Sequence, residues 1–498
     1  MKILNTNQIK EWDSATLAEQ NIDSLQLMQR AAEKLYLKIV NRFGYDFDYH
    51  IFCGNGNNGG DGLALALLML KAGINCKIYC YAGKRSAEND TYLATLMENY
   101  PKHLHFDCLK PIEVIKNKQI IIDALFGNGL SRPLEGVWLD LVKEINKQDF
   151  TVVSIDLPSG LPADRETLFF ESDWYAVQAS ITLSIQSHKE IFFIEPYANQ
   201  CGEIGLIDIN LSPKYINDIN SNINLINNTL CFTLLKKRER FSHKGSYGHA
   251  GFWGGSIGKN GAIMLAAKAA LQSGCGLVSL FAREAQMDIF QIGVPDAMCR
   301  TIESSFDNKY LTGLTAIGIG PGFDESYPAQ QFSTELQSTR IPLVLDAGAL
   351  NILAKLDPVQ FVPKAVITPH SKEFDRLFGA HNNHSERIIK QVSESVKQNI
   401  YIVLKGVHTT ISTPTGKIYY NSSGNPSLAK GGSGDVLLGM ITSFCACGYE
   451  VENSCILAVF LHGLAADLWL NEKKTMNSLT ASELIEYIYL AIAKVEHN

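Results

Sequence analysis

The sequence lacks the features that would assign it to a membrane, a secretory route or nucleic acid. Lysine and arginine number 44 against 51 aspartates and glutamates, so no basic excess exists to attract nucleic acid or anionic lipid. Residues 1–7 contain no apolar core of a signal peptide. The most apolar long segment, residues 262–282, is interrupted by Lys268 and Gln272 and is too polar to span a bilayer. We therefore expect a cytoplasmic protein without nucleic-acid or membrane partners.

Cysteine is present but forms no metal or disulfide pattern. Eleven cysteines, an odd number, are spread singly through apolar segments. The closest pairs, Cys76/Cys80 and Cys445/Cys447, have no companion histidine or cysteine cluster to complete a zinc site. The composition, 46% hydrophobic and 19% charged, is that of a soluble globular protein. Since 498 residues are too many for one ordinary core, two or more domains are expected.

An asparagine-rich segment divides the chain. Residues 211–229 contain Pro213 and few apolar anchors, which predicts a linker between domains 1–215 and 216–498. On both sides, short β-branched runs alternate with helical stretches, which indicates α/β layers on a mostly parallel sheet. The expected strands are 49–53, 76–81, 119–123, 151–156, 181–185, 204–209, 251–253, 277–281, 316–319, 342–345, 365–367 and 401–404. The expected helices are 63–71, 138–147, 262–271, 435–444, 454–470 and 481–493.

The most informative segment is NPSLAKGGSGDVL, residues 425–437. Gly431, Gly432 and Gly434 leave backbone amides free to converge on an anion, and the apolar run that follows starts a helix whose positive end faces them. A phosphate repels a carboxylate, so Asp435 makes sense mainly as a base that deprotonates a hydroxyl during phosphoryl transfer to that oxygen. The alternative is that Asp435 is an N-cap, a position that favours aspartate.

A second glycine-rich loop follows the first expected strand. Gly54, Gly56 and Gly59 match GxGxxG between a strand and a helix, the setting of dinucleotide sites. An NAD dehydrogenase would also carry an acidic residue at the end of the next strand, but residues 79–83 read YCYAG. The sequence therefore argues against a redox enzyme. Residues 57–61 instead supply amide groups suited to a diphosphate and a monovalent cation.

Two aspartates end later strands of the first part. Asp123 is followed by the loop ALFGNGLSRP and Asp156 by LPSGL. Ligands of open α/β sheets lie outside the carboxyl ends of the strands, so these loops and residues 57–61 predict one crevice. The alternative is that each aspartate only caps a turn.

These motifs resemble a known family. The runs NNGGDG, DALFGNGLSRP and IDLPSGL are similar to the NAD(P)H-hydrate epimerase domain, with a Rossmann-like three-layer fold. In the second part, HKGSYGH at 243–249, GGS at 254–256, TPHSKE at 368–373 and KGVHT at 405–409 resemble the ribokinase-like NAD(P)H-hydrate dehydratase domain. Over nearly its full length the chain resembles the bacterial bifunctional repair enzymes. It departs after Leu161, where PADRE replaces an Asp-Thr-Gly-like turn.

For the first domain, the resemblance implies interconversion of the R and S forms of hydrated NADH and NADPH. Asp156 would be the acid–base residue at the hydrated ring carbon. A potassium ion would bind Asn58, Asp123 and Ser159. The hydrated dinucleotide would contact Asn57, Asn58, Gly59, Gly60, Asp61, Gly127, Asn128, Gly129, Leu130, Ser131, Arg132, Pro133 and Asp156.

For the second domain, the resemblance implies dehydration of the S form at the expense of ADP, giving AMP and phosphate. Asp435 would be the base, and Glu373 would hold Mg²⁺ through water. The hydrate would contact Ala262, Gly322, His370 and Asp435. ADP would contact Lys405, Gly406, Val407, His408, Thr409, Asn425, Pro426, Ser427, Leu428, Ala429, Lys430, Gly431, Gly432, Ser433 and Gly434. His462 is expected to be a packed residue without a function, and the protein is expected to be a homo-oligomer.

Two rival hypotheses remain. A small-molecule kinase of the ribokinase type would share the glycine-rich anion site and the base Asp435 but would keep its phosphorylated product. The first part would then be a nucleotide-binding module, or a module that binds a protein partner.

Overall fold

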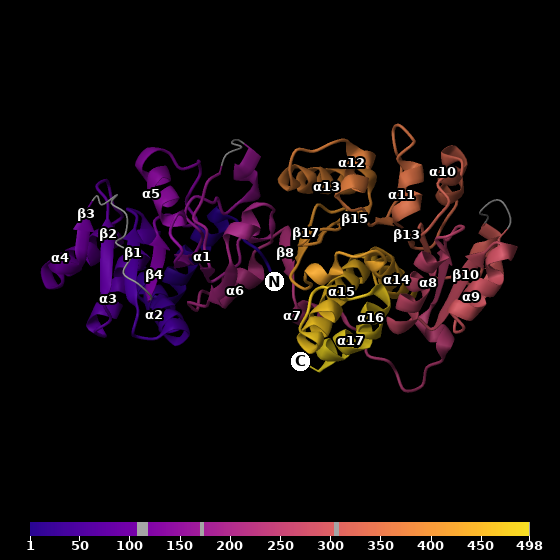
Figure 1. Cartoon of the computed structure of the whole chain (residues 1–498), viewed down its shortest axis with the longest axis horizontal. Helices are drawn as coiled ribbons and strands as arrows, with labels where there is room; N and C mark the ends of the chain where they lie inside the picture. The colour runs from indigo at the N-terminus through magenta and orange to yellow at the C-terminus, as the bar shows by residue number, and fades with distance from the viewer. Residues whose placement is uncertain (107–117, 170–173, 303–307, 498) are drawn as a thin grey trace. The chain divides into compact units, whose positions relative to one another are not determined.

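A computed structural model of the chain describes residues 1–106, 118–169, 174–302 and 308–497. The chain folds as two compact units, Lys2–Ser221 and Asn222–Asn498, and Met1 belongs to the second. Each unit is built on its own sheet (Figure 1). The expected α/β class, Rossmann-like in the first unit and ribokinase-like in the second, is confirmed.

The first unit contains a parallel seven-stranded sheet in the order β3-β2-β1-β4-β5-β6-β7. Its strands are β1 (Asp48–Cys53), β2 (Cys76–Cys80), β3 (Leu104–Phe106), β4 (Gln119–Ala124), β5 (Thr151–Ile155), β6 (Ile181–Ile185) and β7 (Glu203–Ile207). Its helices are α1 (Thr6–Gln20), α2 (Ser24–Phe43), α3 (Asn57–Lys71), α4 (Ala87–Asn99), α5 (Gly136–Asn146) and α6 (Pro213–Asp218).

The alternation of side chains along β1 explains the three layers of this unit. Ile51 points into a core that also contains buried residues of α2 and α3. Phe52 points to the opposite face, into a core with Val142 and Ile145 of α5. Because both faces are covered, the central strands are mostly apolar, as is typical of parallel sheets.

The second unit contains a ten-stranded sheet in the order β11-β10-β9-β12-β13-β14-β15-β16-β17-β8, in which β16 runs antiparallel to both neighbours. Its strands are β8 (Ile223–Ile226), β9 (His249–Trp253), β10 (Leu277–Ala282), β11 (Met298–Thr301), β12 (Ala316–Ile319), β13 (Leu343–Leu345), β14 (Val366–Ile367), β15 (Tyr401–Leu404), β16 (Thr410–Ser412) and β17 (Ile418–Asn421). Its helices are α7 (Asn228–Leu234), α8 (Asn260–Gln272), α9 (Met287–Gly293), α10 (Ala329–Gln337), α11 (Ala347–Leu353), α12 (Ser371–Phe378), α13 (His384–Gln398), α14 (Ser433–Ala446), α15 (Val451–Lys473), α16 (Ala481–Glu486) and α17 (Ile488–Glu496).

Helices cover both faces of this sheet as well. Helices α8, α14 and α15 share one core with Phe252 and Val344, and α10, α11 and α12 share the other with Ile319 and Leu345. Helices α8 and α14 pack very closely, because a Cβ on Gly439 would lie 2.1 Å from the carbonyl oxygen of Ala266. Only glycine permits this approach.

The segment 211–229, predicted as a linker, contains the boundary between the two units at Ser221/Asn222, but most of it is ordered secondary structure. It forms α6, β8 and the start of α7, and β8 pairs in parallel with β17. The few apolar residues of this segment suffice for an edge strand. The asparagines that suggested a linker partly serve as caps: the Asn227 side chain accepts a hydrogen bond from the Leu230 N–H at the start of α7.

Helix α15 is long and apolar enough to cross a bilayer, and it is the one such helix in the described parts of the chain. Most of it is buried against α14, α17 and the sheet of the second unit. Its hydrophobicity is therefore explained by its place in the core.

Candidate active sites

The first unit contains a cavity of about 830 Å³ at the carboxyl ends of its central strands. The structure brings predicted residues from three separate loops into its wall. The lining residues include Asn57, Asn58, Asp61, Gly127, Asn128, Gly129, Leu130, Ser131, Arg132 and Asp156. Apolar side chains of α1 and α2 complete the wall, so the cavity has the mixed lining of a small-molecule site.

Gly59 and Gly60 are buried beneath this wall and are not among its lining residues, and neither is Pro133. A Cβ on Gly59 would lie 1.9 Å from the carbonyl oxygen of Gly54, and one on Gly60 would lie 2.7 Å from the Met28 side chain. These glycines allow the first turn of α3 to pack tightly against its surroundings. Packing therefore explains their place in the motif, and Asn57, Asn58 and Asp61 are the α3 residues of the motif that line the cavity.

Asp123, at the end of β4, is fully buried, and its carboxylate accepts hydrogen bonds from residues outside its own turn. Its Oδ2 accepts hydrogen bonds from Ser154 Oγ and the Ser159 N–H, both 2.8 Å long, and its Oδ1 accepts one from Ser159 Oγ at 2.5 Å. Burial raises the pKa of Asp123, and the bonds from Ser159 and Ser154 oppose that rise. The turn-cap alternative accounts only for its weaker contact with the Leu125 N–H.

The Asn58 side chain next to this cluster is buried without a hydrogen bond at either amide atom, as far as the described residues show. The neighbouring backbone connects the two groups: Ser159 Oγ accepts the Phe126 N–H, and a Cβ on Gly127 would lie 3.1 Å from Asn58 Cγ. A buried amide oxygen without a partner is costly, and a cation would satisfy it. The oxygens of Asn58, Asp123 and Ser159 therefore fit a hard monovalent cation.

Asp156 is held by a lysine that no motif identified. Lys189 is 2% exposed, and its ammonium lies 2.5 Å from Asp156 Oδ1, which also accepts the Ile185 N–H. The ammonium also donates to Ser184 Oγ and to the carbonyl oxygens of Ile185 and Ser187. Asp156 has a left-handed backbone (φ 66°), a strained conformation that is typical of functional sites.

In the second unit, the glycine-rich loop leads into α14 as predicted, but Asp435 is not its N-cap. The N-cap is Gly432, in the left-handed region at φ 94°, and Asp435 lies in the first turn. A Cβ on Gly432 would lie 2.8 Å from Ala481 Cβ and 2.9 Å from the Leu265 side chain, so the loop needs glycine for both reasons. The capping alternative for Asp435 is therefore wrong.

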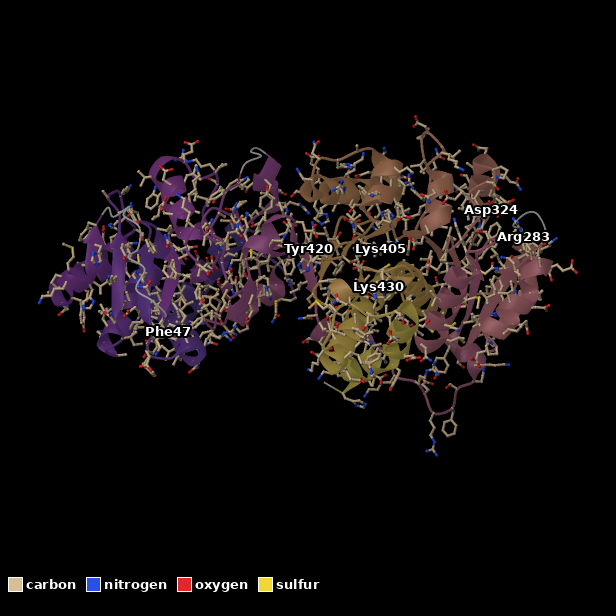
Figure 2. The ribbon with its side chains drawn as sticks, in the orientation of Figure 1. Phe47, Arg283, Asp324, Lys405, Tyr420 and Lys430 are labelled. Carbon is tan, nitrogen blue, oxygen red and sulfur yellow. The ribbon has the colours of Figure 1, made fainter. Side chains whose placement is uncertain are left out.

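Lys405 and a second aspartate lie beside this helix start. Lys405 Nζ is 2.8 Å from Oδ1 of Asp346, which is buried at the end of β13 (Lys405 is labelled in Figure 2). A Cβ on Gly434 would lie 3.1 Å from Lys405 Nζ, so the ammonium reaches the glycine-rich loop. Burial raises the pKa of Asp435 to about 6, the Asp346 carboxylate adds to the rise, and Lys405 opposes it. No motif in the sequence identified Asp346.

The segment that contains His370 adjoins Lys405 through a parallel backbone bridge and a 2.9 Å bond from the Lys405 N–H to the Pro369 carbonyl oxygen. His370 caps α12: its Nδ1 accepts the Lys372 N–H at 3.1 Å. Glu373 Oε2 in turn accepts the His370 N–H at 2.9 Å. The imidazole is half-exposed, and its Nε2 lies 3.5 Å from Oε2 of the buried Glu373, so both side chains belong to the cap of α12.

Gly322 and Ala262 lie at neighbouring strand ends. Gly322 has φ 64°, and a Cβ there would lie 2.4 Å from the Lys259 carbonyl oxygen, just before α8. Ala262 lies in the first turn of α8. A shallow hollow next to them is lined by Gly254, Gly255, Asp324 and Arg283, the last two labelled in Figure 2.

The remaining nucleotide-contact candidates lie on two loops. Thr409 Oγ1 donates to the Gly406 carbonyl oxygen at 3.3 Å, whereas Val407 is 73% exposed. Asn425 is fixed by Asp467, which no motif in the sequence identified: Asn425 Nδ2 donates to Asp467 Oδ1 at 2.9 Å. Residues Pro426–Leu428 form a 3-10 turn, and Lys430 Nζ donates to the Asn477 carbonyl oxygen at 2.7 Å.

His462 is packed as expected, but it also supports the helix start. Its Nε2 lies 3.0 Å from the Ser433 carbonyl oxygen. Burial lowers its pKa to about 4, so the ring is neutral and donates this hydrogen bond. His462 therefore helps to fix the first turn of α14.

Comparison with known proteins also divides the chain into two parts. A family model described as YjeF-related protein N-terminus matches residues 24–191, and one described as NAD(P)H-hydrate dehydratase matches residues 250–489. A bifunctional NAD(P)H-hydrate repair enzyme from Coxiella burnetii is 33% identical over 475 residues, which cover 94% of this chain and 95% of the relative. One from Thermofilum pendens is 29% identical and covers 99% of this chain and 96% of the relative.

Among solved structures, an ADP/ATP-dependent NAD(P)H-hydrate dehydratase from Bacillus subtilis, co-crystallised with ATP/Mg²⁺, is 31% identical. The likeness has a TM-score of 0.50 and covers 56% of this chain and all of that one. The relatives thus match both units of this chain, and they match over nearly their full length. The chain belongs to the family of bifunctional NAD(P)H-hydrate repair enzymes.

Proposed function

We propose that the first unit epimerises the R and S forms of NADHX and NADPHX, and that the second unit dehydrates the S form with ADP as phosphoryl donor. As a member of this family the chain is both an isomerase and a lyase. The observation that carries the assignment of roles is the arrangement of Asp435, Lys405 and Asp346 at the glycine-rich start of α14. In this proposal Asp435 is the base, Lys405 is the phosphate-binding cation, and the backbone N–H groups of the glycine-rich loop are the donors.

In the second site, Asp435 takes the proton of the C6 hydroxyl while that oxygen attacks the β-phosphorus of ADP. The bond from the β-phosphorus to the bridging oxygen breaks, and AMP leaves. The N–H groups of Gly431, Gly432 and Gly434 stabilise charge on the transferred group, and Lys405 pairs with the phosphates. The ring nitrogen then expels the C6 phosphate, and loss of the C5 proton completes NAD(P)H.

The pH dependence of dehydration should report Asp435. Its pKa is raised to about 6, so the base form is lost as the pH falls through that value. We expect kcat/KM for the S hydrate to fall about tenfold per pH unit below pH 6 and to level off above it. The Asp346→Asn variant removes a carboxylate that raises this pKa and frees Lys405 to lower it, so its acid limb should move to lower pH. An acid limb at the same pH in both proteins would contradict the role of Asp435.

In the first site, we propose that a potassium ion binds the oxygens of Asn58, Asp123 and Ser159. The ion would supply charge that offsets the buried carboxylate and would order the loop after β4. Support comes from the buried, unbonded Asn58 amide and from the all-oxygen donor set.

Potassium should therefore stabilise the first unit. Exchanging NaCl for KCl at constant ionic strength should raise its melting temperature and its epimerase rate, and should leave the dehydration of S hydrate unchanged. At ten times the dissociation constant the stabilisation is about 1.4 kcal/mol. Differential scanning fluorimetry and rate assays measure both effects. The Asn58→Ala variant should lose them, and equal responses of the two proteins would reject the site.

For the second site, we propose that Mg²⁺ arrives with the nucleotide phosphates and that Glu373 acts on it through water. In the described parts of the chain, no group of three His, Cys, Asp or Glu side chains is placed to hold a metal. Magnesium commonly binds substrate phosphates and keeps several waters, which fits a site with few protein ligands. We also propose the cytoplasm as the location and a homo-oligomer as the assembly.

Incubation of the protein with S hydrate and ADP tests the function of the second site. We expect reduced-nicotinamide absorbance to return, with one AMP and one phosphate formed per NADH. A stable phosphorylated product from another alcohol, with no return of absorbance, would instead identify a ribokinase-type kinase.

A further inference from the structure

A third carboxyl group faces the cavity of the first unit from a helix that precedes the segment matched by the family model. Asp13 lies in α1, whereas that match begins at residue 24. Asp13 lines the cavity together with Asp61 and Asp156. Within the described parts of the chain, Asp13 forms no hydrogen bond or ion pair, so nothing structural engages its carboxyl group.

Helix α1 is fixed firmly enough to place this side chain. At its start, the Thr6 N–H donates to both oxygens of Asp164, each at 3.1 Å. Asp164 belongs to the segment where the sequence departs from the family pattern. One residue before Asp13, Trp12 is buried, and its Nε1 donates to the Ser212 carbonyl oxygen at 2.8 Å. With its neighbour Trp12 anchored against the core, Asp13 is presented to the cavity.

The three carboxyl groups have different environments. Asp156 is paired with the buried ammonium of Lys189. Burial raises the pKa of Asp61 well above its ordinary value, and the charges of Asp156 and Asp13 add to the rise. Burial, and then the Asp156 charge, raise the pKa of Asp13 to about 6, while Lys189 opposes the rise. Titratable groups whose environments differ in this way take different acid–base roles.

We propose that Asp13 is the second catalytic acid–base residue of the epimerase, opposite Asp156 across the hydrated ring. This inference rests on the proposed function of the first unit. Protonated Asp13 donates its proton to the C6 hydroxyl, and the C6–O bond breaks with its electron pair leaving on water. The N1 lone pair forms the C6=N1 bond of an iminium ion. Water then attacks the other face of C6, the π-electrons return to N1, and Asp156 takes the proton of the incoming water.

Asp156 is suited to that second step. Its Oδ1 is occupied by Lys189 and the Ile185 N–H, whereas Oδ2 accepts no hydrogen bond from the described residues and is left for the water. In the reverse direction the two carboxyl groups exchange roles. The charged and titratable groups that line the cavity with Asp13 are Lys10 of α1, Asp61 of α3, Glu88 of α4, Arg132, Asp156 and Lys189.

The test uses the full chain, a mixture of R and S hydrates, and excess ADP. Wild-type protein should convert both isomers to NADH. In Asp13→Asn, the S fraction should be consumed at the wild-type rate, and conversion of the R fraction should fall at least about 100-fold after subtraction of the uncatalysed rate. Asp13→Glu should retain activity within about tenfold, and Glu11→Gln, on the same helix but outside the cavity, should match wild type. An unchanged R fraction in Asp13→Asn would overturn the proposal, whereas failure of wild type on pure S hydrate would instead refute the dehydratase.

Two further readouts exclude a merely structural role. Epimerisation in H₂¹⁸O should introduce one ¹⁸O at C6 per inversion, and inversion without label would overturn the water-loss step.

The wild-type R-to-S rate should fall as the pH rises above about 6, because Asp13 loses its proton there, and residual turnover of Asp13→Asn should lack this limb. Ionisation of Asp13 costs folding stability above its raised pKa, so at pH 8 Asp13→Asn should melt no lower than wild type.

Discussion

The Asp435→Asn variant is expected to lose ADP-driven dehydration, with kcat reduced by about 10²- to 10⁴-fold. Asparagine keeps the shape of the side chain but cannot accept the proton of the C6 hydroxyl. The first turn of α14 should persist, since its N-cap is Gly432 and Asp435 contributes no capping bond. The rate of NADH formation at saturating S hydrate and ADP measures the effect.

Nucleotide binding separates this role from a loss of the site. Because Asp435 repels phosphate, the asparagine variant should bind ADP at least as tightly as wild type in calorimetry. Interconversion of the R and S hydrates should be unchanged. As a control, Asp288→Asn alters an exposed acid of α9 in the same unit and should leave both activities intact. Undiminished turnover in Asp435→Asn would contradict the account.

The second large effect is expected from Asp156→Asn, which should lower epimerisation at least about 100-fold. The variant removes the carboxylate that takes the proton of the incoming water. It also leaves the Lys189 ammonium buried without a counter-charge, and breaking such a pair costs about 3–5 kcal/mol of stability. NMR exchange between R and S hydrates gives the rate, and thermal unfolding gives the stability.

The double variant Asp156→Asn/Lys189→Met separates these two effects. It replaces the unpaired ammonium by an apolar side chain, so much of the lost stability should return while epimerisation stays low. Dehydration of S hydrate should be unaffected in both variants, since it takes place in the other unit. Recovery of epimerisation together with stability would show that Asp156 is only structural.

Functional residues that lie within short local motifs could be identified from the sequence. Asp435 follows a glycine-rich loop and precedes an apolar helix, and Asp156 ends a β-branched run, so both patterns are visible within about fifteen residues. The central strands were predicted for the same reason: β1, β4 and β5 each contain a short run of apolar residues, IFC, III and VV respectively, as expected of strands covered on both faces.

Partners that act across the fold could not be identified this way. Asp346 can pair with Lys405 because β13 lies two strands from β15 in the sheet, and Lys405 directly follows β15. Lys189 reaches Asp156 because β5 and β6 are neighbours in the sheet. Pairing of distant strands leaves no signal in a single sequence. The strand within the segment 211–229 was not predicted for a similar reason, since β8 is stabilised by pairing with β17 almost 200 residues later.

In the proposed dehydration, the C6 hydroxyl oxygen attacks the phosphorus of ADP before it leaves the ring. S hydrate labelled with ¹⁸O at C6 tests it most directly, with Asp156→Asn as the enzyme so that epimerisation does not exchange the label. Phosphoryl transfer to the hydroxyl predicts that the label appears in inorganic phosphate, one atom for each NADH formed. Label released as water, with unlabelled phosphate, would contradict the account.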